Sequence, residues 1–240
     1  GAPAPIDIKK GIVYYATNLG WHNVPLKSKL EKLLGLQVFA DNDVNMGTRG
    51  EYVLGAGRGT NDFVGFFVGT GIGGGIIVNG KLIHGKNMTG GEVGHIIMIP
   101  DGPLCGCGNR GCLEAISSRI AIVRDLEAGI KKGVPTILND MLKKTPGRIR
   151  SGMLRQAYKA NDPLTVDVLN RSAHYLGIAV ASTVNILGPD RVVIGGGVFE
   201  AIGRRLLPIV RKSAEDHFFG PAGKGMDIAL AELGDNAVAL

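Results

Sequence analysis

Apolar residues along the chain follow two periods, one typical of strands and the other of helices. Short apolar runs predict strands over 11–19, 36–40, 62–69 and 95–100, with a hairpin over 75–85. In that hairpin, Asn79-Gly80 supplies the positive φ angles of a type I′ turn. Apolar residues at helical spacing predict helices over 28–34, from 43 to a glycine-rich stop at 55–57, and over 162–187. Alternating strands and helices indicate an α/β protein.

The predicted helix over 162–187 has clear signals at both ends. Asp162 can cap its first turn, and Pro163 fits the first helical position, where a backbone N–H is not needed. Gly188-Pro189 follows and ends the helix. The segment 191–210 then reads as a strand, a glycine turn and another helix.

Composition limits the class of protein. The 240 residues are 45% hydrophobic with a formal net charge of +6, and no apolar run is long enough to span a bilayer. Lys and Arg are scattered, which favours solvated helix faces over a nucleic-acid interface. The first residues show no basic flank followed by an apolar core, so no signal peptide is expected and we predict a cytoplasmic protein.

All three cysteines of the chain lie close together in the segment 92–114, which also holds a histidine. One imidazole and three thiolates satisfy tetrahedral Zn²⁺, and a set of four protein ligands leaves no open position for catalysis. We therefore predict a structural zinc site that orders this loop, with the ligands His95, Cys105, Cys107 and Cys112. The alternatives are free thiols beside an unrelated histidine, or one disulfide with a thiol left over.

Two glycine clusters are candidates for phosphate and nucleotide binding. Residues 69–75 read GTGIGGG, a turn between predicted strands that can aim backbone N–H groups at phosphate oxygens, with a hydroxyl from Thr70. Residues 194–198 read IGGGV at the start of a predicted helix, where anions are favoured. Each cluster alone fits a turn without a ligand equally well. Neither matches the dinucleotide-binding G-x-G-x-x-G pattern or the P-loop.

Three carboxylates are candidates for the chemistry. Asp43 opens a predicted helix after a predicted strand, where a carboxylate can accept a hydroxyl proton during phosphoryl transfer. Helix capping is the alternative role for the Asp41-Asn42-Asp43 segment. Glu92 and Glu114 flank the predicted zinc ligands, and a loop ordered by a metal would hold both on one side of a pocket. Either also fits a solvated surface position.

Together these segments resemble the ROK family (repressors, unidentified reading frames and kinases), in particular its glucokinase-like sugar kinases. The resemblance runs through nearly the whole chain and rests on DNDVN, GTGIGGG, GEVGH, CGCGNRGCLE and VVIGGGV in this order. It implies an actin-like ATPase (ribonuclease H-like) fold with two lobes and the active site in the cleft. The implied division is 1–42 for the remainder of an N-terminal lobe that is incomplete in this chain, 43–225 for the C-terminal lobe, and 226–240 for a return toward the first lobe.

The resemblance also implies a role for each matching residue. Asp43 matches the catalytic base. The sugar contacts match Asn42, Asp43, Glu92, His95 and Glu114. The zinc ligands match His95, Cys105, Cys107 and Cys112, so that His95 binds both zinc and sugar. The phosphate motif matches Gly69, Thr70, Gly71, Gly73 and Gly74, and the adenosine motif matches Gly195, Gly196 and Gly197.

The implied activity is ATP-dependent phosphorylation of a hexose, first of all glucose, at its primary hydroxyl. Asp43 takes the hydroxyl proton, Mg²⁺ accompanies ATP, zinc is structural, and the family implies a homodimer. No D-x-G-x-T turn, which holds phosphates in the family, occurs here. The chain is therefore expected to start late in the first lobe and to be impaired in ATP hydrolysis by itself. Ala4 also replaces a glycine of the family pattern, a change expected to be mild.

Other functions stay open at this point. One is a sugar-responsive repressor of the same family whose DNA-binding domain is absent from this chain. Another is a kinase for an N-acylhexosamine, mannose or fructose, and a third is a zinc-stabilised interaction module without chemistry. Retention of Asp43 favours an enzyme, because a repressor can lose the base and still bind sugar. The clustering of sugar and nucleotide motifs argues against the interaction module.

Overall fold

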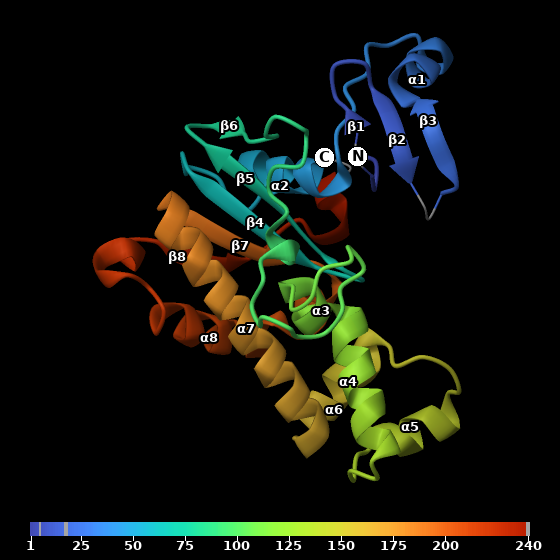
Figure 1. Ribbon diagram of the computed structural model, residues 1–240, viewed down its shortest axis with the longest axis vertical. Helices are drawn as coiled ribbons and strands as arrows, with labels where there is room; N and C mark the ends of the chain where they lie inside the picture. The colour runs from blue at the N-terminus through green and yellow to red at the C-terminus, as the bar shows by residue number, and fades with distance from the viewer. Residues whose placement is uncertain (5, 17–18, 239–240) are drawn as a thin grey trace.

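The chain forms two β-sheets, with helices packed around the larger one (Figure 1). The computed structural model describes residues 1–4, 6–16 and 19–238. The smaller sheet is antiparallel with the order β1-β2-β3, and the larger has the order β6-β5-β4-β7-β8. In the larger sheet, β5 pairs antiparallel with β4, whereas β7 pairs parallel with it. This mixed sheet and its helices confirm an α/β protein.

The secondary-structure elements have the following bounds. The strands are β1 (Ile6–Asp7), β2 (Ile12–Ala16), β3 (Trp21–Pro25), β4 (Phe63–Val68), β5 (Ile72–Val78), β6 (Lys81–Leu82), β7 (Arg191–Gly195) and β8 (Asp227–Leu230). The α-helices are α1 (Leu26–Leu34), α2 (Asp43–Leu54), α3 (Leu113–Ser117), α4 (Arg119–Lys131), α5 (Leu138–Lys144), α6 (Ser151–Lys159), α7 (Pro163–Leu187) and α8 (Gly197–Glu215). The 3-10 helices are η1 (Val93–His95), η2 (Gly220–Gly223) and η3 (Gly234–Val238). Within the described part of the chain, no helix combines the length and the apolar character needed to cross a bilayer.

The central strand β4 is buried on both faces because helices cover the larger sheet from two sides. Val64, Phe66 and Val68 belong to the core that also includes residues of α7 and α8. Phe63 packs instead near Tyr52 of α2, with 5.9 Å between the ring centroids. Helix α2 therefore lies on one face of the sheet, and α7 and α8 lie on the other.

Helix α2 lies close to β5 because glycines of that strand face it. A Cβ atom at Gly73 would be 2.6 Å from Val44 Cγ2, and a Cβ atom at Gly75 would overlap the side chain of Thr48. Any larger residue at these positions would push the helix away from the sheet. The two glycines therefore set the distance between the sheet and a helix that begins with Asp43.

Glu51 fastens α2 to the C-terminal segment of the chain. Its side chain is fully buried, and its carboxylate accepts hydrogen bonds from the backbone N–H groups of Ala56, Glu232 and Leu233, at 3.0, 3.1 and 2.7 Å. Close by, a Cβ atom at Gly50 would overlap a backbone carbonyl of η3. The segment 232–237 is thereby held against the helix that carries Asp43.

Replacing Glu51 with glutamine should lower the free energy of unfolding by about 1–3 kcal/mol, because the amide NH₂ would face a backbone N–H that now has an acceptor. Urea unfolding measures the change. The control is Glu215→Gln at the exposed end of α8, which should change the same quantity by less than about 0.5 kcal/mol. Equal effects of the two variants would contradict the role assigned to Glu51.

The predicted hairpin and the longest predicted helix both form. Asn79 and Gly80 have φ angles of 50° and 71° between β5 and β6, as a type I′ turn requires. Helix α7 begins after Asp162, whose carboxylate accepts a hydrogen bond from the N–H of Thr165 at 2.9 Å. It ends at Gly188 in the left-handed conformation. In both places local side-chain chemistry determines the backbone.

Two predicted strands do not form, and both predictions were wrong. Residues 36–40 run as an irregular segment, and Phe39 is 80% exposed, because no strand among the described residues pairs with this segment. Residues 95–100 make an isolated bridge from Ile97 to Cys112 instead of a ladder. Ile96 and Met98 pack against the main core from this irregular segment, whereas Ile97 is 55% exposed, so the apolar residues are accommodated without extending the sheet.

The division of the chain into 1–42, 43–225 and 226–240 stays a prediction. The smaller sheet and α1 fall within the first range and project from the body of the molecule in Figure 1. Helix α2 begins at the first residue of the second range. In the third range, β8 joins the larger sheet and η3 packs against α2.

Candidate active site

A cavity of about 510 Å³ opens between the start of α2, the β4–β5 turn, the segment before η1, and α3. It brings together residues that lie far apart in the sequence. Most of the predicted site residues line it, namely Asn42, Asp43, Gly69, Thr70, Gly71, Gly73, Gly74, Glu92, His95, Glu114 and Gly196. Asp43 therefore shares one cavity with the predicted sugar contacts and with the glycine turn.

The start of α2 positions Asp43. The side chain of Asn42 caps the helix by accepting hydrogen bonds from the N–H groups of Val44 and Asn45, at 2.9 and 3.2 Å. Asp43 follows as the first helical residue and is half-buried at the cavity wall. Asn42 is the capping residue, and although Oδ1 of Asp43 also accepts a hydrogen bond from the N–H of Val44 at 2.9 Å, the Asp43 carboxylate lies beside the cavity.

Asp41 joins the start of α2 to the loop over 84–90, whose residues Met88, Thr89 and Gly90 also line the cavity. Its carboxylate lies 2.7 Å from Nε2 of His84 and accepts a hydrogen bond from the side chain of Asn45 at 3.0 Å. The backbone carbonyl of His84 accepts a hydrogen bond from the N–H of Gly90 at 2.8 Å. His84 thus closes the loop over 84–90 and connects it to the segment that carries Asp43.

Replacing His84 with alanine should lower the free energy of unfolding by about 1–3 kcal/mol, because the mostly buried Asp41 would lose one of its partners. Chemical denaturation followed by circular dichroism measures this. His22→Ala is the matched control, since His22 is an exposed histidine whose ring packs tilted against that of Tyr15, with 4.7 Å between the ring centroids. A His84 variant as stable as the control would show that the contact with Asp41 contributes nothing.

The turn between β4 and β5 is shorter than the GTGIGGG pattern predicts. Gly73 and Gly74 lie inside β5, paired with Phe67 and Phe66, where their small size admits α2 and neighbouring loops. The turn itself is 69–71, and the backbone N–H groups of Thr70 and Gly71 have no hydrogen-bond partner among the described residues. These two N–H groups are the ones available to an anion.

Glu114 connects the turn to the cysteine loop. Its Oε2 accepts a hydrogen bond from the N–H of Ile72 at 2.9 Å, and its Oε1 lies 3.6 Å from Sγ of Cys105. Because Glu114 also lines the cavity, one side chain fixes the turn and faces the space where a sugar would lie.

The second glycine cluster lies between two cavities. Gly196 lines the first cavity, whereas Gly195 lines a second of about 710 Å³ between α6, α8 and the end of β8. Gly197 is the first residue of α8. The second cavity also contains Arg155, Lys159, Phe199 and Glu232. Sequence reasoning missed these side chains because only the fold brings α6 next to α8.

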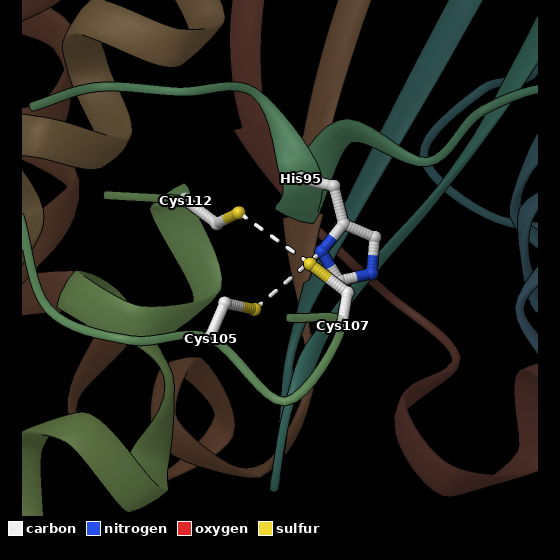
Figure 2. A group of neighbouring side chains, drawn as sticks. All are labelled: His95, Cys105, Cys107 and Cys112. Carbon is white, nitrogen blue, oxygen red and sulfur yellow. Dashed lines mark hydrogen bonds between the residues drawn. The ribbon is translucent and has the colours of Figure 1, made fainter. Parts of the chain in front are cut away.

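The four predicted zinc ligands converge on one point. Their ligand atoms all lie within 4.8 Å of one another (Figure 2). Sγ of Cys107 lies 3.7 Å from Sγ of Cys112, and Sγ of Cys105 lies 3.7 Å from Nδ1 of His95. Metal–sulfur bonds of about 2.3 Å in a tetrahedron give sulfur–sulfur edges of about 3.8 Å, so these separations fit tetrahedral zinc. The three cysteines form no disulfide with one another.

The thiols differ in their surroundings. Burial, together with the smaller effect of the neighbouring thiols of Cys107 and Cys105, raises the pKa of Cys112 to about 12. Burial also raises the pKa of Cys105, whereas the backbone N–H of Asn109 lowers that of the exposed Cys107. A divalent cation would supply the positive charge that three adjacent thiolates require.

His95 faces two ways. Its Nδ1 points into the cysteine cluster, while its Nε2 lies 3.9 Å from the carboxylate of Glu92 on the cavity side. One imidazole can therefore contact a metal and a sugar hydroxyl at the same time.

Asn45, Met88 and Thr89 also line the cavity. These three residues were not predicted from the sequence. Only Asn45 could have been found there, because it lies in the same DNDVN segment as Asn42 and Asp43.

Known proteins resemble this chain in sequence and structure. The ROK family profile matches residues 1–240. A glucokinase of Halalkalibacterium halodurans is 38% identical over 238 residues, which cover 99% of this chain and 72% of the relative. A xylose repressor of Caldicellulosiruptor bescii is 33% identical over 243 residues, which cover 100% of this chain and 59% of the relative. The crystal structure of a ROK family glucokinase from Streptomyces griseus in complex with glucose and AMPPNP has a TM-score of 0.85 and 34% identity, and the match covers 99% of this chain and 77% of that one.

Proposed function

The chain belongs to the ROK family and has its actin-like ATPase fold, and from this we propose that the protein is a kinase that transfers the γ-phosphoryl group of ATP to the primary hydroxyl of a hexose. Relatives named glucokinase favour glucose as the sugar. The observation that carries the proposal is the shared cavity, where the Asp43 carboxylate faces the same space as Glu92, Glu114 and the free N–H groups of the β4–β5 turn.

Each group in the cavity has a part in the proposed reaction. The carboxylates of Glu92 and Glu114 accept hydrogen bonds from sugar hydroxyls, and the imidazole of His95 forms another hydrogen bond with a hydroxyl. These contacts orient the sugar ring. Asp43 accepts the proton of the primary hydroxyl as that oxygen bonds to the γ-phosphorus and the bond to the β–γ bridging oxygen breaks. The N–H groups of Thr70 and Gly71 stabilise the charge on the phosphoryl oxygens. Mg²⁺ bound with ATP would neutralise phosphate charge.

The adenosine part of ATP fits the second cavity. Gly195 and Gly196 connect that cavity to the first, and glycine lets a nucleotide pass close to the backbone there. A Cβ atom at Gly196 would lie 2.7 Å from backbone atoms of Val68, and its φ of 86° favours glycine. Phe199 offers an apolar surface for the base, while Arg155 and Lys159 offer positive charge.

We assign the cysteine cluster to one structural zinc ion held by His95, Cys105, Cys107 and Cys112. The four donors complete a tetrahedron, so zinc would order the loop rather than act on the substrate. Glu114 lies two residues after the last cysteine, in the first turn of α3, and His95 belongs to both sites. The ordered loop therefore holds the sugar contacts in place.

A sugar-responsive repressor is the second candidate, because a xylose repressor is 33% identical to this chain. Such a protein would need the sugar contacts of the cavity but not a base at position 43. The presence of Asp43 at the cavity wall favours the kinase.

The test is coupled ADP release by the full-length protein with glucose, mannose, fructose, N-acetylglucosamine and N-acetylmannosamine. Glucose-dependent turnover is expected. Sugar binding by calorimetry without turnover on any sugar would overturn the kinase proposal and support the repressor.

A further inference from the structure

A groove of about 650 Å³ lies outside both cavities, between α4 and the segment 148–150. Helix α4 presents one face to the groove. Its lining residues are Arg119, Ile120, Val123, Arg124 and Glu127, and residues spaced three or four positions apart lie on the same side of a helix. Arg148 and Arg150 form the opposite wall. We call this feature, with its four arginines on the apolar surface of Ile120 and Val123, the arginine groove.

Most of the positive charge in the arginine groove is not neutralised by the protein. The exposed side chains of Arg148 and Arg150 make no hydrogen bond or ion pair among the described residues. The Arg119 guanidinium donates a hydrogen bond to the uncharged hydroxyl of Thr70 at 3.2 Å. Arg124 is the exception, since it pairs with Asp125 at 2.8 Å.

Along the α4 wall of the groove, the positive charge lies toward the N-terminal end of the helix, at Arg119 and Arg124. Glu127, on the next turn of α4, is the acidic residue in the lining, so the other end is less favourable to an anion. At the favourable end, Arg119 meets Thr70 at the edge of the first cavity. The backbone of Arg119 also donates a hydrogen bond to the carbonyl of Gly69 at 3.0 Å, which fixes the start of α4 against the β4–β5 turn.

Guanidinium groups bind phosphate through paired hydrogen bonds in a fixed plane, which makes arginine suited to this anion. Arginines on two opposite walls of one groove suit an anion with several charged groups better than a single phosphate. We propose that the arginine groove binds an anion that carries a chain of phosphate groups, either an inorganic oligophosphate or the phosphate chain of a nucleotide. The groove adjoins the first cavity at Arg119, whereas Arg148 and Arg150 lie outside both cavities, and the proposal does not depend on the kinase activity.

The experiment uses the full-length protein and isothermal titration calorimetry with tripolyphosphate and with ATP, each alone. Tripolyphosphate is titrated again with the cleft filled by AMPPNP. The double variant Arg148→Gln/Arg150→Gln should bind a phosphate chain about 10–100-fold more weakly than the wild type, since each lost charge-assisted contact costs about tenfold or less. Both side chains are exposed, so the fold should persist, which circular dichroism checks.

Lys132→Gln is the matched control, because Lys132 is an exposed cation just after the other end of α4 and outside the groove. It should change the affinity by less than about twofold. Weakened tripolyphosphate binding in the AMPPNP-filled protein identifies an inorganic chain as the ligand, and weakened ATP binding identifies a nucleotide. Equal affinities of the double variant and the wild type for both ligands, or equal losses in the double variant and the control, would overturn the proposal.

Discussion

Replacing Asp43 with asparagine is expected to lower kcat for sugar phosphorylation by about 10²–10⁴-fold, the range in which a general base contributes to catalysis. Asparagine keeps the size and the hydrogen-bonding oxygen of the side chain but cannot take a proton. Sugar binding should therefore change much less than turnover. Steady-state kinetics on the full-length protein gives kcat, and calorimetry with glucose gives the affinity.

The matched control is Asp140→Asn, because Asp140 is an exposed aspartate on α5 that pairs with Lys143 and lies outside the first cavity. Its kcat should stay within about twofold of the wild type. If the Asp43 variant turned over glucose as fast as the control, the proton would have another acceptor. A variant that lost glucose binding to the same extent as turnover would assign Asp43 to binding instead of catalysis.

Replacing Cys107 with serine should remove the metal from the loop. The full-length wild type should contain about one zinc per chain by elemental analysis, and the variant should contain close to none, because a neutral hydroxyl replaces a thiolate ligand. Structural zinc contributes directly to folding, so the melting temperature should fall as well. Sugar affinity should fall with it, since the loop carries His95 and Glu114.

Asn109→Ala is the matched control for this variant, because Asn109 is an exposed residue of the same loop whose side chain is outside the ligand set. It should keep its zinc and its melting temperature. Full zinc occupancy in the Cys107 variant would show that the cluster holds metal without this sulfur, or that zinc binds elsewhere. Absence of zinc from the wild type would reject the metal site altogether.

Local sequence signals were enough to predict the parts of the fold whose ends carry specific side chains. Helix α7 has Asp162 at its start and Gly188 after its end, and the β5–β6 hairpin has Asn79-Gly80. For the segments 36–40 and 95–100, apolar content was the only signal, and it does not distinguish a strand from an irregular segment that packs on the core or lies exposed. A strand also needs a partner, and the partner is a property of the tertiary structure.

In the candidate site too, residues in short motifs were predicted, whereas contacts that depend on the tertiary structure were not. Asp43, Glu92 and His95 were predicted from short motifs, and their grouping in one cavity follows from the strand and helix ends that carry them. The contact between Asp41 and His84 was not predicted, because it joins residues 43 positions apart that belong to no common motif. The arginine groove was missed for a similar reason, since its two walls come from separate segments.

The close approach of α2 to β5 has a consequence for mutational scanning of this protein. Gly75 lines neither of the two cavities, but it touches Thr48 one turn beyond Val44, in the helix whose first residue is Asp43. A substitution there would tilt or displace the helix and carry the carboxylate with it. Gly75 should therefore tolerate replacement as poorly as a residue that contacts the substrate, and a scan scored by activity would class this buried strand position with the reacting groups.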